Sequence, residues 1–312
     1  MDRKKFINEL KSIKLVAHRL GYQMTNYPEN SLDVLQTIFE NKEMLDACDG
    51  FEFDICFTKD HIPVVIHDKY IDDISDSIGL VKSYTIKELE KVNFRFRKSL
   101  QKSNSQEFKI VKLETILNFF QKNKQLLKEK IIKIETKDFT YLNTQNIIIL
   151  ADILNKYSEI KDNIIHLSYY PQNLILLKRI QLKKNYNIIK SDLLCDYKAM
   201  VTISKFINNL DYISFRIKTN SFPNANSNNP KRVNRKILHD TFFMKFSNAI
   251  SEKTLTYAIN KYGSVGLYVL NDDNDINEIC KRISDNFFKK NYGNIIFTTN
   301  NPLYLRKLSK NK

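Results

Sequence analysis

The stretch 50-GFEFDICFT-58 alternates apolar side chains with polar or small ones, which is typical of a β-strand. With a period of two, the carboxylates of Glu52 and Asp54 fall on one face, opposite the phenylalanines. An edge strand would expose both carboxylates to water. A strand enclosed on both sides would bury them, and buried carboxylates need a partner or an ion. Whether this strand lies at an edge or is enclosed depends on the pattern of strands and helices in the rest of the chain.

Strand and helix patterns alternate over the rest of the chain. Strand character is found at eight places, near 14–19, 50–58, 130–137, 163–169, 186–194, 211–217, 264–271 and 293–299. Helical spacing follows at 31–41, 113–123, 144–157, 171–184, 198–209, 251–263, 275–288 and 302–310. This alternation indicates parallel strands joined by crossover helices, and eight such units suffice for a closed barrel. We therefore expect an α/β fold, a (β/α)₈ TIM barrel. A doubly wound open sheet is the alternative, but it would leave the polar strand ends without a common focus.

A polar region at about 69–110 interrupts the alternation, after a second short β run at 62–68. It contains one expected helix, at 85–92, and indicates a small insertion after the second strand. We expect a single barrel domain over residues 1–312. The segment 219–236 is rich in Asn, Ser and Pro and is expected to be a long loop.

The composition sets bounds on function. The 312 residues are 42% hydrophobic, which is enough for a sizeable core, and 50 basic against 35 acidic residues give a formal charge of +15. This excess favours anionic partners, although the lysines are scattered and a general compositional bias would explain them equally well. The four cysteines form no C-x-x-C pair and indicate buried thiols.

The chain contains no sequence typical of export or membrane insertion. The stretch MDRKKFINELKSIK lacks the apolar segment of a signal peptide, and nowhere is there a run of ~18 apolar residues. We expect a cytoplasmic protein without a transmembrane segment. The sequence does not indicate an oligomeric state.

Polar residues concentrate where the expected strands end, and a TIM barrel gathers those ends on one rim. The residues concerned are His18, Arg19, Glu52, Asp54, His67, Asp68, Glu135 and Lys137. Three carboxylates suit a hard cation such as Mg²⁺ or Ca²⁺, and two histidines can divide general acid and base work. Arginine and lysine would bind an anion. Together these groups indicate phosphoryl transfer or phosphodiester hydrolysis.

The ordered pattern AHR…PENS…FEFDICFTKDHIPVVIHD…KLETIL…IKIETK resembles the glycerophosphodiester phosphodiesterase family, strongly over 14–137 and more weakly beyond. That family has a TIM barrel with a small insertion after the second strand. The resemblance implies one divalent cation held by Glu52, Asp54 and Glu135, with His18 and His67 as the acid–base pair. It also implies that Arg19 contacts phosphate, that Lys137 contacts substrate, and that Glu29 and Asn30 order the site.

The implied reaction is hydrolysis of a small glycerophosphodiester to glycerol phosphate and an alcohol, through a cyclic phosphate. The chain departs from the family pattern at Leu20, where the family has glycine, and at Asn300, where it often has aspartate. Two alternatives stay open. One is a phosphodiesterase acting on a larger polyol-phosphate or glycan-phosphate, such as a capsule or teichoic-acid-type polymer. The other is a non-catalytic binder of an anionic ligand, although a binder would not need three carboxylates beside two histidines.

Several residues also have simpler interpretations. A lone histidine such as His18 is more often a core or capping residue, and Glu135 with Lys137 could form only an internal ion pair. We interpret His61 as solvated and both His166 and His239 as structural. No nucleic-acid partner is expected, because no RNA- or DNA-binding signature is present.

Overall fold

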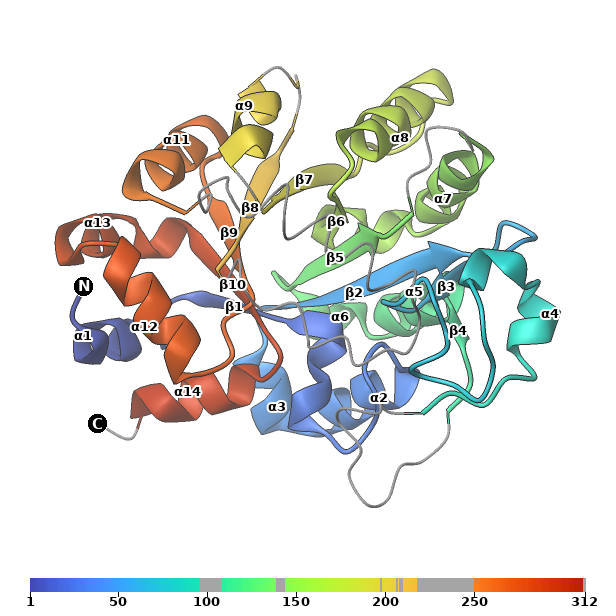
Figure 1. The fold of residues 1–312 in the computed structure, drawn as a ribbon, viewed down its shortest axis with the longest axis horizontal. Coiled ribbons are helices and arrows are strands. Elements are labelled where there is room, and N and C mark those ends of the chain that lie inside the picture. Colours follow the sequence, from blue (N-terminus) through green and yellow to red (C-terminus); the bar gives the residue numbers. More distant parts are fainter. Residues whose placement is uncertain are drawn as a thin grey trace.

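Eight parallel strands form a closed barrel in the computed structural model, which describes residues 1–95, 108–138, 144–196, 198–205, 207, 210–217 and 250–310. The barrel closes where β1 (Lys14–Ala17) pairs with β2 (Gly50–Phe57) on one side and β10 (Ile295–Thr299) on the other. Around the barrel the order is β1, β10, β9, β8, β7, β6, β5, β2. Helices surround the strands (Figure 1). The predicted (β/α)₈ barrel is confirmed, and the open sheet is excluded.

The remaining barrel strands are β5 (Ile131–Thr136), β6 (Ile164–Ser168), β7 (Lys190–Cys195), β8 (Tyr212–Arg216) and β9 (Val265–Tyr268). The helices that follow strands are α2 (Leu32–Glu40), α3 (Lys42–Ala47), α5 (Leu113–Lys122), α6 (Lys124–Leu127), α7 (Thr144–Lys156), α8 (Pro171–Lys183), α9 (Lys198–Lys205), α11 (Glu252–Tyr262), α12 (Asp273–Arg282), α13 (Asp285–Asn291) and α14 (Pro302–Lys310). Short 3₁₀ segments are η1 (His18–Met24), η4 (Ser158–Asn163) and η5 (Tyr292–Asn294).

Several elements differ from the sequence-based expectation. The helix expected at 275–288 is two helices, because Ser284 caps a new one by accepting a hydrogen bond from the Phe287 N–H. Strand β7 begins at Lys190 rather than 186, after a turn in which Asn185 has a φ of 55°. An unpredicted helix, α1 (Arg3–Glu9), is capped by the Asp2 side chain.

The chain between β2 and α5 adds structure outside the barrel. Strand β3 (Pro63–Val65) pairs antiparallel with β2, and β4 (Val111–Lys112) pairs antiparallel with β3. Between them lie η2 (Val81–Ser83) and the short helix α4 (Ile86–Leu89), which begins with a capping box formed by Thr85 and Glu88. The described part of this segment has its own apolar cluster, built on Val64, Ile71, Leu89 and Phe94 among others. An insertion therefore follows the second strand.

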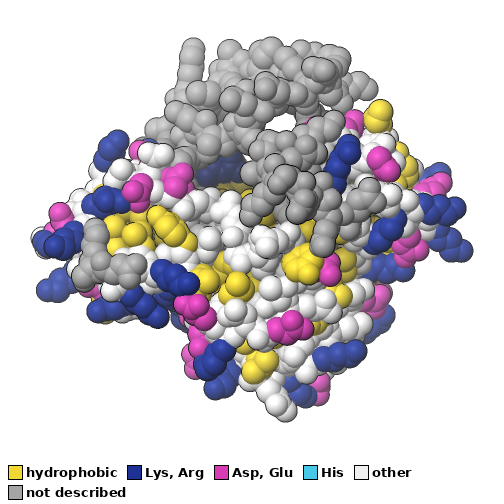
Figure 2. Space-filling model, turned by 90° about the horizontal axis from the view of Figure 1, so that it is seen from below, with side chains coloured by type: hydrophobic (Ala, Val, Ile, Leu, Met, Phe, Trp, Pro, Cys, Tyr) yellow, Lys and Arg dark blue, Asp and Glu magenta, His cyan; other side chains and the backbone are white. Residues whose placement is uncertain are grey.

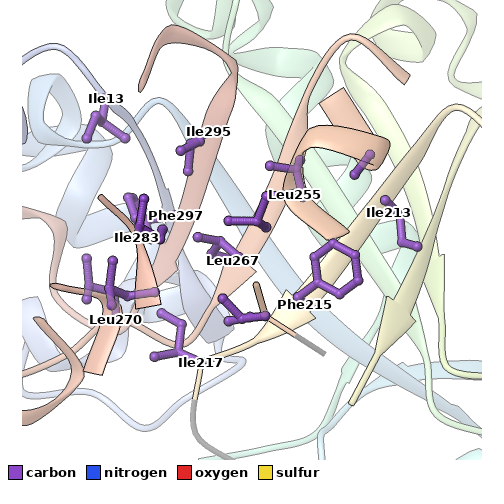
Figure 3. Close-up of a cluster of buried hydrophobic side chains, with 14 of the residues drawn as sticks. Ile13, Ile213, Phe215, Ile217, Leu255, Leu267, Leu270, Ile283, Ile295 and Phe297 are labelled. Carbon is purple, nitrogen blue, oxygen red and sulfur yellow. The ribbon is translucent and has the colours of Figure 1, made fainter. Parts of the chain in front are cut away.

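Strand side chains alternate between two environments. Outward apolar residues pack under the helices, as Phe215, Leu267 and Phe297 do in Figure 3. Inside the barrel, Lys133 Nζ lies 2.9 Å from Asp192 Oδ2, which also accepts a 2.7 Å hydrogen bond from Ser214 Oγ. Gly266 faces this group, because a Cβ there would lie 1.9 Å from Ser214 Oγ. These side chains therefore fill the lower part of the barrel interior, as the layers of a TIM barrel do.

The four cysteines are buried and unpaired, as predicted. Among the described residues, no helix is long and apolar enough to cross a membrane. On the face shown in Figure 2, lysine and arginine side chains are interspersed with aspartate and glutamate. The described residues on that face therefore form no single basic patch.

Candidate active site

The predicted site residues come from the first three strand ends of the barrel and from β3. His18 and Arg19 follow β1, Glu52 and Asp54 lie on β2, and Glu135 lies on β5 with Lys137 just beyond its end. The Pro28-Glu29-Asn30 loop precedes α2, and His67 follows β3. The contacts below bring all nine side chains to one part of the rim.

The three carboxylates form a compact group. One oxygen from each of Glu52, Asp54 and Glu135 can be chosen so that all lie within 4.8 Å of one another. The β2–β5 register places Asp54 directly beside Glu135, and β1 and β5 flank β2 on either side. The three residues are at most 6% exposed. The edge-strand explanation for Glu52 and Asp54 is therefore excluded.

Two cations lie against the carboxylates. Lys137 Nζ is 2.8 Å from Asp54 Oδ1 and 2.7 Å from Glu135 Oε1; these are charge contacts without hydrogen-bond alignment. The Arg19 guanidinium donates to both carboxylate oxygens of Glu29, at 2.8 and 2.7 Å, and its Nε is 3.8 Å from Asp54 Oδ2. Glu29 therefore fixes the direction of the arginine side chain.

Asn30 ties the loop to the floor of the site. Its side-chain N–H donates to Asp54 Oδ2 at 3.0 Å, and its Oδ1 accepts from the Asp54 backbone N–H at 3.3 Å. Its own backbone N–H donates to the Arg19 carbonyl at 3.3 Å. Its φ of 60° is one that asparagine tolerates better than most residues. Asn30 thus positions Asp54 and the Arg19 backbone together.

The turn between β1 and the loop has an unusual backbone. Arg19, Leu20 and Gly21 have φ values of 49°, 68° and 84°, so two residues with side chains adopt the left-handed region. The Leu20 side chain is fully buried, and the Arg19 backbone N–H donates to Glu52 Oε2 at 3.0 Å. The chain therefore makes this turn with leucine, and Gly21 extends the same left-handed run.

Each histidine has a partner on Nδ1. His18 Nδ1 is 2.6 Å from Asn300 Oδ1, and its Nε2 is 3.8 Å from Glu52 Oε2. His67 Nδ1 is 2.8 Å from Asp68 Oδ1. Since both partner atoms accept, the Nδ1 protons point at them and Nε2 carries the lone pair of each neutral ring.

Burial governs the protonation of the two rings. Burial and the nearby charge of Arg19 lower the pKa of His18 to about 3. Burial and the charges of Arg19 and Lys137 lower the pKa of His67 to about 4. Both rings are therefore neutral at pH 7 in the protein without ligands and able to accept a proton.

Burial and neighbouring charges shift the pKa values of the three carboxylates in different directions. Burial, reinforced by the neighbouring carboxylates, raises the pKa of Glu52 well above its usual value, and burial also raises that of Glu135. Burial would raise the pKa of Asp54 as well, but Lys137, His67 and Arg19 hold it below its usual range. The cluster has more carboxylate than Arg19 and Lys137 neutralise, because Arg19 is already paired with Glu29. Buried, crowded oxygen donors of this kind fit a hard divalent cation.

A small, partly open recess adjoins the site. It is lined by Glu29, Asn30 and His67, and also by Ile74, Arg95 and Phe108 from the insertion. The insertion thus contributes a wall next to one of the two histidines.

Sequence reasoning missed part of the rim. Asn300 was known only as a departure from the family pattern, and its contact with His18 bridges 282 positions of sequence. Asp196 and Arg216 also lie at strand ends and were not predicted. Tyr169 and Tyr268, for which the sequence allows a pocket-lining role as well as a core role, lie at the ends of β6 and β9. The strand-end rule applied to β7 and β8 would have found Asp196 and Arg216.

The other histidines are as follows. His166 is buried with its Nε2 2.8 Å from Thr136 Oγ1, which agrees with a structural role. The solvated interpretation of His61 was wrong, since it is partly buried and its Nδ1 lies 2.7 Å from Asn146 Oδ1. His239 and the expected loop at 219–236 lie outside the described residues.

Comparisons with known proteins agree on one family. Residues 21–236, more than half of the chain, match the model of the glycerophosphoryl diester phosphodiesterase family. The chain is 37% identical over 78 residues to a glycerophosphodiester phosphodiesterase of Bacillus altitudinis, covering 25% of this chain and 29% of that protein. It is 35% identical over 81 residues to human glycerophosphodiester phosphodiesterase 1, covering 26% of this chain and 22% of that protein. These matches span less than a third of either relative.

Solved structures match the whole barrel. A putative glycerophosphoryl diester phosphodiesterase from Silicibacter pomeroyi DSS-3 superimposes with a TM-score of 0.65 at 12% identity, over 97% of both chains. An Oleispira antarctica phosphodiesterase in complex with the product sn-glycerol-3-phosphate has a TM-score of 0.59 at 14% identity, over 95% of this chain and 96% of that one. At such low identity these likenesses establish the shared fold.

Proposed function

The chain belongs to the glycerophosphoryl diester phosphodiesterase family, and from this premise we propose that it is a metal-dependent phosphodiesterase. Its reaction would be hydrolysis of a glycerophosphodiester to glycerol phosphate and an alcohol. The observation that carries the proposal is the buried group of Glu52, Asp54 and Glu135, set beside two histidines on the barrel rim.

We propose that these three carboxylates hold one divalent cation, Mg²⁺ or Ca²⁺. The mutual spacing of their oxygens, within 4.8 Å, suits ligands around a single ion with metal–oxygen distances of about 2.1–2.6 Å. When bound, the cation would offset the negative charge of the phosphate and act as a Lewis acid. Asn30 would keep Asp54 oriented through its two contacts with that residue.

Arg19 and Lys137 would bind the phosphodiester. Burial would lower the pKa of Lys137, but Asp54 and Glu135 raise it, so the ammonium stays charged beside the carboxylates. The Glu29 carboxylate accepts two hydrogen bonds from Arg19 Nη1, which limits the rotamer entropy that the arginine would lose when the phosphate binds. The cationic pair thus compensates the anionic ligand in a site otherwise rich in carboxylate.

His18 and His67 would divide the proton transfers. One neutral ring takes the proton of a substrate hydroxyl next to the phosphorus, and that oxygen attacks to form a cyclic phosphate. The other ring would take up a proton from solvent once the phosphate anion lies beside it, and would give that proton to the departing alcohol oxygen as the bond from phosphorus to that oxygen breaks. Water then opens the cycle with the two roles reversed. Asp68 and Asn300 keep the Nε2 atoms in the form that these transfers need.

We further propose that residues 1–312 act as one barrel domain that includes the insertion, because β3 pairs directly with β2 and His67 follows β3. The insertion would then help to form the site rather than function separately.

The test is hydrolysis of glycerophosphocholine, glycerophosphoethanolamine and a teichoic-acid-like polymer with Mg²⁺, with Ca²⁺ and with a chelator. We expect hydrolysis of the small diesters that is lost on chelation and in Glu52→Gln, which removes charge at constant shape. Glu159→Gln, in an exposed ion pair with Lys124, is the matched control. Activity unaffected by both chelation and Glu52→Gln would refute metal dependence. Cleavage of the polymer alone would instead favour the larger substrate, and cleavage of nothing would favour the non-catalytic binder.

A further inference from the structure

A second group of polar side chains occupies the rim at the ends of β6, β7, β8 and β9. Tyr169 and Asp196 directly follow β6 and β7, and Arg216 and Tyr268 are the last residues of β8 and β9. Four successive strand ends therefore each contribute one member. Tyr169 and Tyr268 also pack against Ile165, Leu167 and Leu194, which form an apolar layer beneath.

The four side chains contact one another. Arg216 Nε is 3.1 Å from Asp196 Oδ1, and Arg216 Nη2 donates to Tyr169 Oη at 3.0 Å. Tyr268 Oη donates to Asp196 Oδ1 at 2.9 Å, and the guanidinium carbon lies 5.9 Å from the Tyr268 ring centroid. The two tyrosine rings meet edge to face, at 6.4 Å and 78°. Such a network holds each side chain in one orientation.

This group adjoins the carboxylate site. In the β5–β6 register, Glu135 lies beside Leu167. Lys137 and Tyr169 each follow two residues later, so they lie at neighbouring strand ends and their side chains point to the same side of the sheet as Glu135 and Leu167. A phosphodiester held at Lys137 would therefore extend one ester arm over Tyr169.

The net charge of the group indicates which kind of ester arm it would bind. The positive charge of Arg216 is compensated by Asp196, so the group carries no net charge to attract either a cationic or an anionic substituent. It does offer hydroxyl, carboxylate and guanidinium atoms close together, beside two aromatic rings. The neighbouring hydroxyls of a polyol can donate hydrogen bonds to some of these atoms and accept them from others. The C–H groups of the polyol can pack on the aromatic rings.

We propose that the ends of β6 to β9 form a specificity subsite for the leaving alcohol, which is the arm of the diester other than glycerol, and that this alcohol is neutral and polyhydroxylated. The subsite consists of Tyr169, Asp196, Arg216 and Tyr268. The inference rests on the proposed function and adds the class of alcohol that leaves. It predicts that glycerophosphoinositol, with a neutral polyol, is preferred over glycerophosphocholine, with a quaternary ammonium.

The test compares kcat/KM for these two diesters in the wild type and in two variants. Tyr169→Phe removes one hydroxyl, and Arg216→Gln removes the guanidinium donors and leaves the Asp196 carboxylate uncompensated, which favours a cationic arm over a neutral one. Each should lower the ratio of kcat/KM for the inositol diester to that for the choline diester by about 5- to 15-fold, the effect of a lost hydrogen bond. Tyr304→Phe, on the exposed face of α14, is the matched control and should keep the ratio. Thermal melts of all variants show whether the fold is kept.

The outcomes are distinct. A wild type that cleaves both diesters equally, or variants that keep the wild-type ratio, would overturn the subsite and leave the phosphodiesterase proposal standing. If no diester is cleaved, the phosphodiesterase proposal fails, and the subsite is judged by saturation-transfer NMR with free myo-inositol. Binding in the wild type that is lost in Arg216→Gln would support it, and binding kept in that variant, or no binding in the wild type, would overturn it.

Discussion

The left-handed turn at Leu20 allows the energetic cost of the site's backbone to be measured. Leu20 has a φ of 68° and a fully buried side chain, so two opposing terms meet at one residue. A residue with a Cβ costs about 1–2 kcal/mol in this conformation. Truncating a buried leucine costs about 2–5 kcal/mol. Burial therefore outweighs backbone strain, and both Leu20→Ala and Leu20→Gly should lower the free energy of unfolding.

The difference in unfolding free energy between Leu20→Gly and Leu20→Ala measures the backbone strain separately from the loss of burial. Glycine in place of alanine ordinarily destabilises by about 0.4–1 kcal/mol, through the entropy of the unfolded chain. At position 20 glycine also escapes the left-handed cost, so Leu20→Gly should be more stable than Leu20→Ala by about 0.5–1 kcal/mol. At Leu35, fully buried in α2, the order should be the reverse, with glycine less stable by about 1 kcal/mol.

The measurement is equilibrium unfolding in urea for all four variants, compared by midpoint at a common slope. Leu20→Gly falling below Leu20→Ala by the same margin as the pair at Leu35 would refute the account. The turn would then store no strain, and the leucine would be accommodated there without cost.

Three further predictions follow from the site and the core. His18→Ala and His67→Ala should each lower turnover by a factor on the order of 10²–10⁴, and full turnover in either variant would exclude its acid–base role. A divalent cation at 100 times its Kd should stabilise the wild type by about 2.7 kcal/mol but not Glu52→Gln, and equal shifts in calorimetry would place the ion elsewhere. Burial lowers the pKa of His166 to about 3, so only the unfolded chain binds its proton as the pH falls below about 6.5. The wild type should lose on the order of 1–4 kcal/mol of stability relative to His166→Gln between about pH 6.5 and 3; parallel pH profiles for the two proteins would contradict this.

The barrel could be predicted because its determinants are local and repeated. Eight alternations of strand and helix leave few topologies, and handedness and short connections reduce them further. The carboxylate group could be predicted for the same reason. The period of two puts Glu52 and Asp54 on one face, and the barrel rule brings Glu135 and Lys137 to the same rim. The fold and the carboxylate group could therefore each be predicted from several independent parts of the sequence.

What escaped prediction depends on contacts distant in sequence or on backbone detail. The Asn300 contact with His18 follows from barrel closure, since β1 and β10 are neighbours only once the barrel is formed. The break between α12 and α13 depends on one capping serine inside a continuous helical pattern, Ser284. The pairing of Asp196 with Arg216 joins two strand ends that belong to no recognised motif.

The contact between His18 and Asn300 also has a consequence for the order of events during synthesis. The ribosome adds about 5–20 residues per second, so the 282 positions between the two residues correspond to roughly 15–60 s of translation. Throughout that interval β1 lacks its β10 neighbour, and the His18 ring lacks the amide that orients it. A nascent chain could already have the carboxylates of β2 and β5 in place and still be unable to turn over substrate. The onset of activity would then coincide with docking of the last strand, which makes catalysis itself a reporter of barrel closure.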